Sequence, residues 1–334
     1  MKLNHSVFLA QSIKGIRMNR NIFFGIFFIL GMFSSRDIFS QTSLRHEQED
    51  IAAGPMQIEK VKDGLYLIRG PFSRCMRSDC PPDSGRRYAD DLNHETGDIA
   101  VRVTPQGLIL VDSKFYDQVD NILELIRTIS PLPIMYLLNT HHHPDHAQGN
   151  GIFQSTGMDI VGHKNTRANF LAIAQPGEPN IVFEREASVF LGDVEVRLLH
   201  VGRGHTNGDS IIYFPDLRTV HAGDLIIDGM PFIDYTAGGS AKEWIQTIDA
   251  LLQIDFDTLI PGHGWLMNKE DVVAYKYRFE EMNRRMQELA QNRVPIDDVL
   301  ELLKLDELGW DNTVSTSTWL NNSLERYYEE MLNE

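Results

Sequence analysis

Short apolar runs alternate with amphipathic stretches along most of the chain, and this alternation predicts an α/β fold. The continuous apolar run Ile134–Leu138 is typical of a buried strand. Helices are expected at 117–129, 165–174 and 241–252, where apolar residues recur every three or four positions. Further strands are expected at 58–68 with a turn at Lys62–Gly64, as a pair at 98–103 and 108–112, and as two short strands within 189–201 about Gly192. Single strands are expected at 159–162, 210–214, 219–222 and 258–260.

After Glu270 the pattern changes to that of one long amphipathic helix. Its apolar stripe is interpreted as core packing on the preceding domain, and not as a cofactor site. Residues 293–334 are expected to add one or two helices as a C-terminal extension. Packing on the domain is the default for them, with a substrate lid and a partner contact as alternatives. The stripe consists of Val272, Tyr275, Phe279, Met282, Met286 and Leu289.

The N-terminal part has the pattern of an export signal. An apolar run at 22–33 follows three basic residues, Lys14, Arg17 and Arg20. The run is too short to cross a bilayer comfortably and has the length of a signal-peptide core. We therefore expect a signal peptide at 1–40, translated from Met1 or Met18, and an exported protein, periplasmic or secreted. An uncleaved signal anchor is the alternative, and 41–55 is interpreted as a linker.

Composition narrows the class of protein further. The chain has 334 residues, 42% of them hydrophobic, which is enough for one large domain with a full core, expected at 56–292. The net charge of −16 argues against nucleic-acid binding, which needs a basic surface. Cys75 and Cys80 lie in a long loop at 71–97, where a disulfide is expected after export. Free thiols and an additional metal site are the alternatives.

The residues with the clearest chemistry follow the strand at 134–138. His141, His143, Asp145 and His146 fall within six residues. In extended backbone, residues two apart point the same way, so His141 and His143 are expected to face one ion. Pro144 favours a turn, beyond which Asp145 and His146 could serve a second ion. Imidazole and carboxylate ligands suit zinc, and also iron and manganese. A histidine-rich surface loop is the alternative.

Three later motifs each follow an apolar run and are flanked by glycine. They place His205 in Gly-His-Thr-Asn-Gly-Asp, Asp224 in Ala-Gly-Asp-Leu and His263 in Pro-Gly-His-Gly. Together with the first motif, they resemble the metallo-β-lactamase superfamily of binuclear hydrolases. The resemblance covers about residues 56 to 290 and implies a four-layer αββα sandwich, with the metals at one edge between two sheets.

The resemblance also implies a role for each residue. Two Zn²⁺ ions are expected, with Fe or Mn as alternatives. The first would be held by His141, His143 and His205, and the second by Asp145, His146 and His263, with Asp224 bridging them. Asp145 and Asp224 are the candidate catalytic proton carriers. His142 fits no ligand position, and Asp112 at a strand end is expected either to orient a histidine or to cap its strand.

The implied activity is hydrolysis of a small-molecule substrate, in which a hydroxide shared by the two ions attacks an ester, lactone, thioester or amide carbonyl. Asp224 and Ile227 depart from the zinc β-lactamases, which often have cysteine and lysine at these positions. The carbonyl substrate is therefore left unassigned. The alternatives are a true β-lactamase, a glyoxalase-II-like thioesterase, an iron-dependent persulfide dioxygenase and a non-catalytic metal-binding accessory protein. The sequence does not predict an oligomeric state.

Overall fold

The computed structural model describes residues 55–70, 96–310 and 314–332. The predictions for the signal peptide, for most of the linker and for Cys75 and Cys80 lie outside the described residues. Within the described ranges, no helix is both long enough and apolar enough to cross a membrane.

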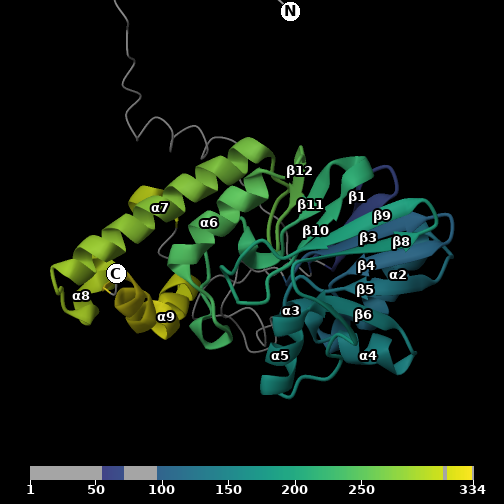
Figure 1. The fold of residues 1–334 in the computed structure, drawn as a ribbon, viewed down its shortest axis with the longest axis horizontal. Coiled ribbons are helices and arrows are strands. Elements are labelled where there is room, and N and C mark those ends of the chain that lie inside the picture. The colour runs from purple at the N-terminus through teal and green to yellow at the C-terminus, as the bar shows by residue number, and fades with distance from the viewer. Residues whose placement is uncertain (1–54, 71–95, 311–313, 333–334) are drawn as a thin grey trace, which may run out of the picture.

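The strands of the described chain form two mixed sheets (Figure 1). Parallel pairing joins β4 to β5, β5 to β6, β6 to β7 and β11 to β12, and the other neighbours are antiparallel. The seven-stranded sheet has the order β1 (Gln57–Lys62), β2 (Leu65–Arg69), β3 (Ile99–Thr104), β4 (Gly107–Val111), β5 (Ile134–Leu138), β6 (Asp159–His163) and β7 (Ile181–Phe183). The five-stranded sheet has the order β12 (Thr258–Ile260), β11 (Thr219–His221), β10 (Ile211–Phe214), β9 (Val194–Leu199) and β8 (Glu186–Leu191).

Helices follow or separate these strands. Figure 1 shows α6 and α7 beside β10, β11 and β12, with α9 farther from the strands, below α7 and next to α8. The α-helices are α2 (Val119–Ile129), α3 (Pro144–Ala147), α4 (Asn150–Ser155), α5 (Lys164–Ala172), α6 (Ala241–Leu252), α7 (Lys269–Gln291), α8 (Ile296–Leu303) and α9 (Val314–Leu332). Short 3₁₀ turns are η1 (Tyr116–Gln118), η2 (Pro215–Leu217), η3 (Gly223–Leu225), η4 (Tyr235–Ala237) and η5 (Leu305–Leu308).

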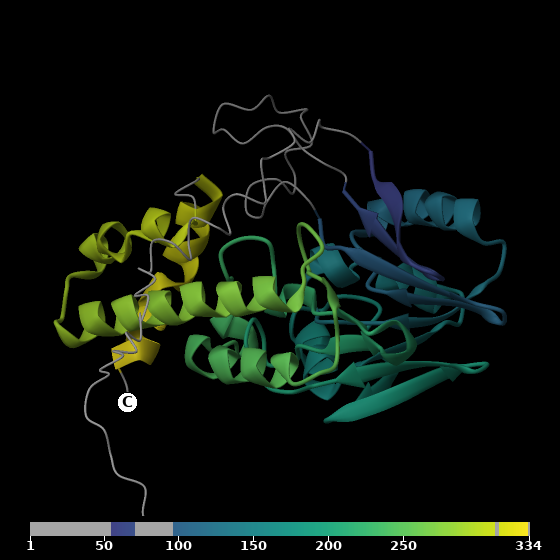
Figure 2. The ribbon, with the colours of Figure 1, turned by 90° about the horizontal axis from the view of Figure 1, so that it is seen from above.

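Alternating side chains of the buried strands divide the core into layers. In β4, Ile109 and Val111 face the five-stranded sheet, whereas Leu108 and Leu110 pack against α2. In β10, Ile212 faces the other sheet, whereas Ile211 packs against the helices α6 and α7. Figure 2 shows α2 lying on the outer side of the seven-stranded sheet. The molecule is thus a helix–sheet–sheet–helix sandwich, which confirms the predicted αββα architecture.

The C-terminal helices extend the outer helical layer. The apolar stripe of α7 packs in one cluster with Trp244 of α6, as predicted, and all of its residues except the partly buried Leu289 are buried. Val299 of α8, Leu305 of η5 and Tyr327 of α9 belong to the same cluster. Packing on the domain is therefore the arrangement that the structure shows for the described part of 293–334. The division of the chain at residues 292 and 293 stays a prediction.

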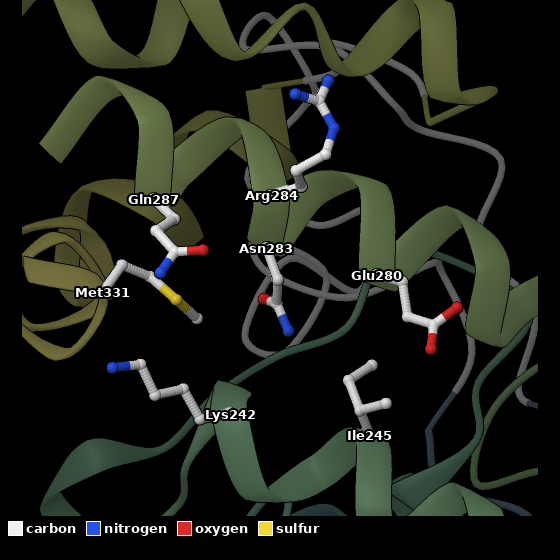
Figure 3. A pocket seen from close by; sticks show the side chains of 7 residues that line it. All are labelled: Lys242, Ile245, Glu280, Asn283, Arg284, Gln287 and Met331. Atoms are coloured by element: carbon white, nitrogen blue, oxygen red, sulfur yellow. The ribbon is translucent and has the colours of Figure 1, made fainter. Parts of the chain in front are cut away.

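A shallow hollow of about 260 Å³ opens where α6, α7 and α9 meet (Figure 3). Its polar side chains are largely bound to protein groups, since Asn283 donates to the Ala241 carbonyl and Arg284 pairs with Glu281. None of its lining residues belongs to the predicted metal site. They are Lys242, Ile245, Glu280, Asn283, Arg284, Gln287 and Met331.

Candidate metal centre

The four motifs meet because their strands end at the same edge of the sandwich. β9 and β11 both lie antiparallel to β10, and β12 lies parallel to β11, so their carboxyl ends point one way. His205, Asp224 and His263 follow these three strands. The motif from His141 to His146 follows β5 of the facing sheet and leads into α3. The loops at the carboxyl ends of these strands thus form one cluster from residues that lie up to about 120 positions apart in the sequence.

The first predicted set of ligands forms a compact group. One ligand atom from each of His141, His143, His205 and Asp224 lies within 4.8 Å of the others. The Nδ1 atom of His143 lies 2.8 Å from Nε2 of His205. Oδ2 of Asp224 lies 3.6 Å from Nε2 of His205 and 3.9 Å from Nε2 of His141. The three imidazoles therefore converge on one side of the Asp224 carboxylate.

The second predicted set lies on the other side of Asp224. Asp145, His146 and His263 also have ligand atoms within 4.8 Å of one another. The Nε2 atoms of His146 and His263 are 3.2 Å apart, and Nε2 of His263 is 3.2 Å from Oδ2 of Asp145. Oδ1 of Asp224 lies 3.0 Å from Nε2 of His146 and 3.5 Å from Nε2 of His263. Asp224 thus turns one oxygen toward each histidine group.

Asp112 supports this arrangement from the end of β4. Its Oδ1 accepts the backbone N–H of Thr140 at 2.9 Å, and its Oδ2 accepts the Thr140 hydroxyl at 2.6 Å. The same Oδ2 lies 3.0 Å from Nδ1 of His146. A carboxylate in this position holds Nδ1 protonated and leaves Nε2 free to act as a ligand. Of the two roles predicted for Asp112, the structure shows the one that orients a histidine.

Two further orienting groups come from the segment before η4, and the sequence did not reveal them. Oδ2 of Asp234 lies 2.9 Å from Nε2 of His143, and the Phe232 carbonyl lies 2.6 Å from Nδ1 of His205. These contacts leave Nδ1 of His143 and Nε2 of His205 to face the centre. The Asp234 side chain also caps η4. An aspartate in such a segment is typical of a turn, so the local sequence does not indicate its contact with a histidine.

His142 lies beside the cluster without joining either main group. Its ring is buried, and burial lowers its pKa to about 3. One of its ring nitrogens lies within 4.8 Å of ligand atoms of His143 and Asp234. His142 thus lies outside the two predicted sets of ligands.

The histidines of the cluster differ in the direction in which their pKa values are shifted, because burial lowers these values and the carboxylates of Asp145 and Asp224 raise them. Burial lowers the pKa of His141 and lowers that of His205 to about 4. Burial also acts to lower the pKa of His146, but the carboxylates of Asp224 and Asp145 outweigh it and raise this pKa to about 10. Burial acts to raise the pKa of Asp224, but the histidines, His146 foremost, hold it well below its usual value. Ionised carboxylates beside imidazoles suit a cation.

The donor set fits one or two divalent ions. Nε2 of His141 is buried and has no hydrogen-bond partner among the described residues, although it faces the cluster. A buried polar atom without a partner is costly, and coordination of an ion would satisfy it. Tetrahedral zinc with N ligands at 2.0–2.1 Å places those atoms about 3.3 Å apart. The spacing of 3.2 Å between His146 and His263 is close to this value.

Two glycines let the backbone approach the cluster closely. A β-carbon at Gly262 would collide with Oδ1 of Asp224, and one at Gly97 would collide with the ring of His146. Both contacts involve side chains that are themselves buried and held by neighbours. Glycine at 97 and 262 is therefore required by the packing of the site.

Replacing Asp234 by asparagine is expected to weaken metal binding about 10- to 100-fold, because the amide holds the His143 imidazole less firmly than a carboxylate does. Chelator competition on the purified protein measures the change. Asp193→Asn, in the exposed turn between β8 and β9, is the matched control and should leave the affinity unaltered. Equal affinities of wild type and Asp234→Asn would show that the contact does not orient a ligand.

The C-terminal helix α9 holds the segment that carries Phe232 and Asp234. Glu330 of α9 accepts the Tyr235 hydroxyl at 2.6 Å and the Ser240 hydroxyl at 2.5 Å. Ser323, two turns earlier in α9, donates to the Ile233 carbonyl at 3.0 Å. Both ends of the segment are thus tied to a helix far away in sequence.

Glu330→Ala is expected to lower the free energy of unfolding by about 2 kcal/mol, because it removes charge-assisted hydrogen bonds. It should also weaken metal binding, since the segment that orients His143 and His205 loses its anchor. Thermal unfolding and chelator competition measure the two effects. Glu325→Ala, at an exposed position of the same helix, should change neither. An unchanged metal affinity in a destabilised Glu330→Ala protein would separate α9 from the centre.

The fold and the cluster define an αββα protein with a histidine–aspartate centre at the edge between two sheets. A family model described as the metallo-beta-lactamase superfamily matches residues 99–263, and the chain belongs to this superfamily. Its members are mostly metal-dependent hydrolases.

Individual relatives are distant. The chain is 24% identical over 145 residues to the 2,4-dinitroanisole O-demethylase subunit alpha of Nocardioides sp. (strain JS1661), a match that covers 42% of this chain and 44% of that protein. It is 23% identical over 195 residues to the metallo-beta-lactamase type 2 of Elizabethkingia meningoseptica, a match that covers 58% of this chain and 72% of that protein. The structure of a metallo-beta-lactamase from Pontibacter korlensis has a TM-score of 0.56 at 18% identity, covering 68% of this chain and 99% of that one.

Proposed function

We propose that the protein is an exported, zinc-dependent hydrolase that acts on an ester, lactone, thioester or amide carbonyl. In this proposal His141, His143 and His205 hold one ion, and Asp145, His146 and His263 hold the other. Asp224 bridges them. The observation that supports it most directly is the orientation of the Asp224 carboxylate, which turns a different oxygen toward each group. Iron and manganese are the alternative ions.

Bound divalent ions would supply an acidified water, with a pKa of about 7, and would polarise the carbonyl. The chain's own residues hold the imidazoles in place through Asp112, Asp234 and the Phe232 carbonyl. The Asp145 side chain is 16% exposed, compared with 3% for Asp224. We therefore assign transfer of a proton to the leaving group to Asp145, and the bridging role to Asp224.

The choice of substrate rests on the residues around Asp224. Ile227 is apolar and buried, so this position supplies no charge to a substrate. This favours esters, lactones and thioesters over β-lactams. A β-lactamase is the second candidate, because relatives from Elizabethkingia meningoseptica and Pontibacter korlensis carry that name.

The proposal that the protein is exported rests on the apolar run at 22–33, and N-terminal sequencing of the mature protein tests it.

The experiment is metal analysis of the mature protein followed by assays with esters, lactones, thioesters and a chromogenic cephalosporin. Bound zinc with chelator-sensitive hydrolysis of one acyl class is the expected result. Efficient cephalosporin turnover, on the order of 10⁴ M⁻¹s⁻¹ or more, would make the second candidate correct. Bound iron with oxygen consumption would indicate a dioxygenase. A metal-loaded protein without turnover in any assay would contradict a hydrolase.

A further inference from the structure

A buried lysine follows β4, close to the second predicted set of ligands. Lys114 is completely buried. Its ammonium donates to the Thr96 carbonyl at 3.1 Å, to the Thr96 hydroxyl at 3.2 Å and to the Gly97 carbonyl. Lysine is almost never fully buried unless its charge is paired or hydrogen-bonded, because desolvation of the ammonium is costly. Lys114 therefore fixes the backbone of residues 96 and 97 to the end of β4.

The segment of residues 96–98 lies against the ring of His146, a member of the second predicted set. A β-carbon at Gly97 would come within 2.4 Å of the ring atoms, so the backbone there is in direct contact with the imidazole. The His146 carbonyl also accepts the N–H of Ser113 at 2.6 Å, and Asp112 contacts Nδ1. The imidazole is thus confined by the end of β4 together with the 96–98 segment.

The backbone of Asp98 connects the same segment to the loops of two further predicted ligands. Its N–H donates to the Gly262 carbonyl at 2.7 Å, in the Pro-Gly-His-Gly motif. Its carbonyl lies 3.0 Å from Nε2 of His221, the last residue of β11. Since Nδ1 of His221 accepts the N–H of Gly223 at 3.1 Å, Nε2 carries the proton and donates it. The 96–98 segment is therefore linked to the loop that carries Asp224 as well.

The backbone around Lys114 has an uncommon conformation. Asp112 and Lys114 have φ values of +64° and +52°, in the left-handed region. Residues with a β-carbon adopt this conformation at a cost, so it persists where the surroundings hold it. Here the Lys114 carbonyl accepts the N–H of Gly149 at 2.9 Å, between α3 and α4. Lys114 thus joins the end of β4, the turn after α3 and the 96–98 segment.

We propose that Lys114 is a positioning residue for the second ion, which acts by holding the 96–98 segment against the His146 ring and the loop of Gly262. An ammonium suits this role, because three donors on a long side chain let one group bind two successive carbonyls. The contacts of the segment go to the second predicted set and to the loop of Asp224, so the first ion should be affected less. This inference rests on the two-ion centre of the proposed function.

The first test is chelator competition for zinc, which measures the affinity for each of the two ions. Lys114→Met keeps the length of the side chain and removes its donors, so it should weaken binding of the second ion at least about tenfold and leave the first within about twofold. Lys114→Gln, which keeps one donor group at a shorter reach, should cause a smaller loss. Wild-type affinity for both ions in Lys114→Met would overturn the proposal, and so would an equal loss of both.

Cobalt substitution shows which ion is lost. Imidazole protons next to bound cobalt have large paramagnetic shifts in proton NMR spectra. In Lys114→Met with one cobalt per chain, these shifts should disappear for His146 and His263 and remain for His205. The opposite pattern would contradict the proposal.

Arg102→Met is the matched control, because it also replaces a buried cation that donates to backbone carbonyls. Arg102 is 6% exposed, donates to the carbonyls of Gly64 and Val103 at 3.0 and 3.1 Å, and pairs with Asp216. This variant should have a lower melting temperature and unchanged affinity for both ions. Loss of the second ion here too would show that destabilisation alone causes it, and would refute a specific role for Lys114.

The second test uses the wild-type protein, so it does not depend on whether a Lys114 variant folds. Because linkage is reciprocal, a segment that stabilises a bound ion is itself stabilised when that ion binds. Amide hydrogen exchange at Gly97 and Asp98 should therefore slow at least about tenfold when the second zinc ion binds, and not when the first binds. Unchanged exchange on binding of the second ion would overturn the proposal.

The proposed function and the role of Lys114 fail separately, because neither test depends on turnover. A protein that gives both expected results but hydrolyses no acyl compound would contradict the hydrolase alone. A protein that binds two ions and hydrolyses an acyl compound, but whose 96–98 segment does not respond to the second ion, would contradict the role of Lys114 alone.

Discussion

Asp224→Asn is expected to lose at least one of two bound metals and to reduce turnover roughly 10³-fold, which corresponds to about 4 kcal/mol of transition-state stabilisation. The amide keeps the size of the side chain but not its negative charge. Oδ1 lies 3.0 Å from Nε2 of His146, and Oδ2 lies 3.6 Å from Nε2 of His205, so one substitution acts on both groups. Metal content per chain and kcat/KM on the best substrate measure the result.

The control for this substitution is Asp193→Asn, which makes the same chemical change at an exposed turn. It should retain full metal content and activity. Unfolding curves of both variants separate a lost site from a lost fold. Two metals per chain and wild-type kcat/KM in Asp224→Asn would show that Asp224 does not bridge the ions.

Gly262→Ala is expected to reduce activity at least about 100-fold although it adds only a methyl group. The new β-carbon would collide with Oδ1 of Asp224, so the carboxylate has to turn away from His146 and His263. The backbone around residue 262 cannot retreat easily, since its N–H donates to the Ile226 carbonyl and its carbonyl accepts from Asp98. Metal content and kcat/KM measure the effect, and loss of the second ion should accompany it.

Gly151→Ala is the matched control for this prediction. Its β-carbon would approach the Pro176 side chain at 3.2 Å and would not contact any residue of the centre. This variant should keep its metals and its activity. Full activity in Gly262→Ala would mean that Asp224 does not need the position that it occupies in the structure, and would weaken the case for a bridging carboxylate.

Elements with a strong local pattern could be predicted from the sequence to the residue. The strand Ile134–Leu138 and the helix Ala241–Leu252 were both predicted with their observed bounds. The helix is amphipathic and begins after Ser240, whose side chain caps it. The strand β7 and the helix α4 were missed. β7 has three residues and α4 has six, which is too short for a periodic pattern, and β7 is defined by its pairing with β6.

For the candidate site too, the sequence indicated some features and not others. Motif order and residue type resemble those of the superfamily, and this resemblance selected the seven predicted ligands, which stay a prediction. The sequence did not indicate that Asp234 contacts His143, a residue 91 positions earlier. Nor did it indicate that the guanidinium of Arg278 packs against the Trp310 ring. Both observations depend on how helices and loops pack across the sandwich.

The sequence by itself determined most of the strands and helices in their order, the apolar stripe of α7 and the identity of the candidate ligands, because these depend on neighbouring residues and on short motifs. Only the tertiary structure decided which oxygen of Asp224 faces which histidines and which groups orient them. Those properties arise when two sheets pack face to face and bring loops from distant parts of the chain to one edge. Distances across that edge depend on sheet packing and strand register, which no local pattern of residues specifies.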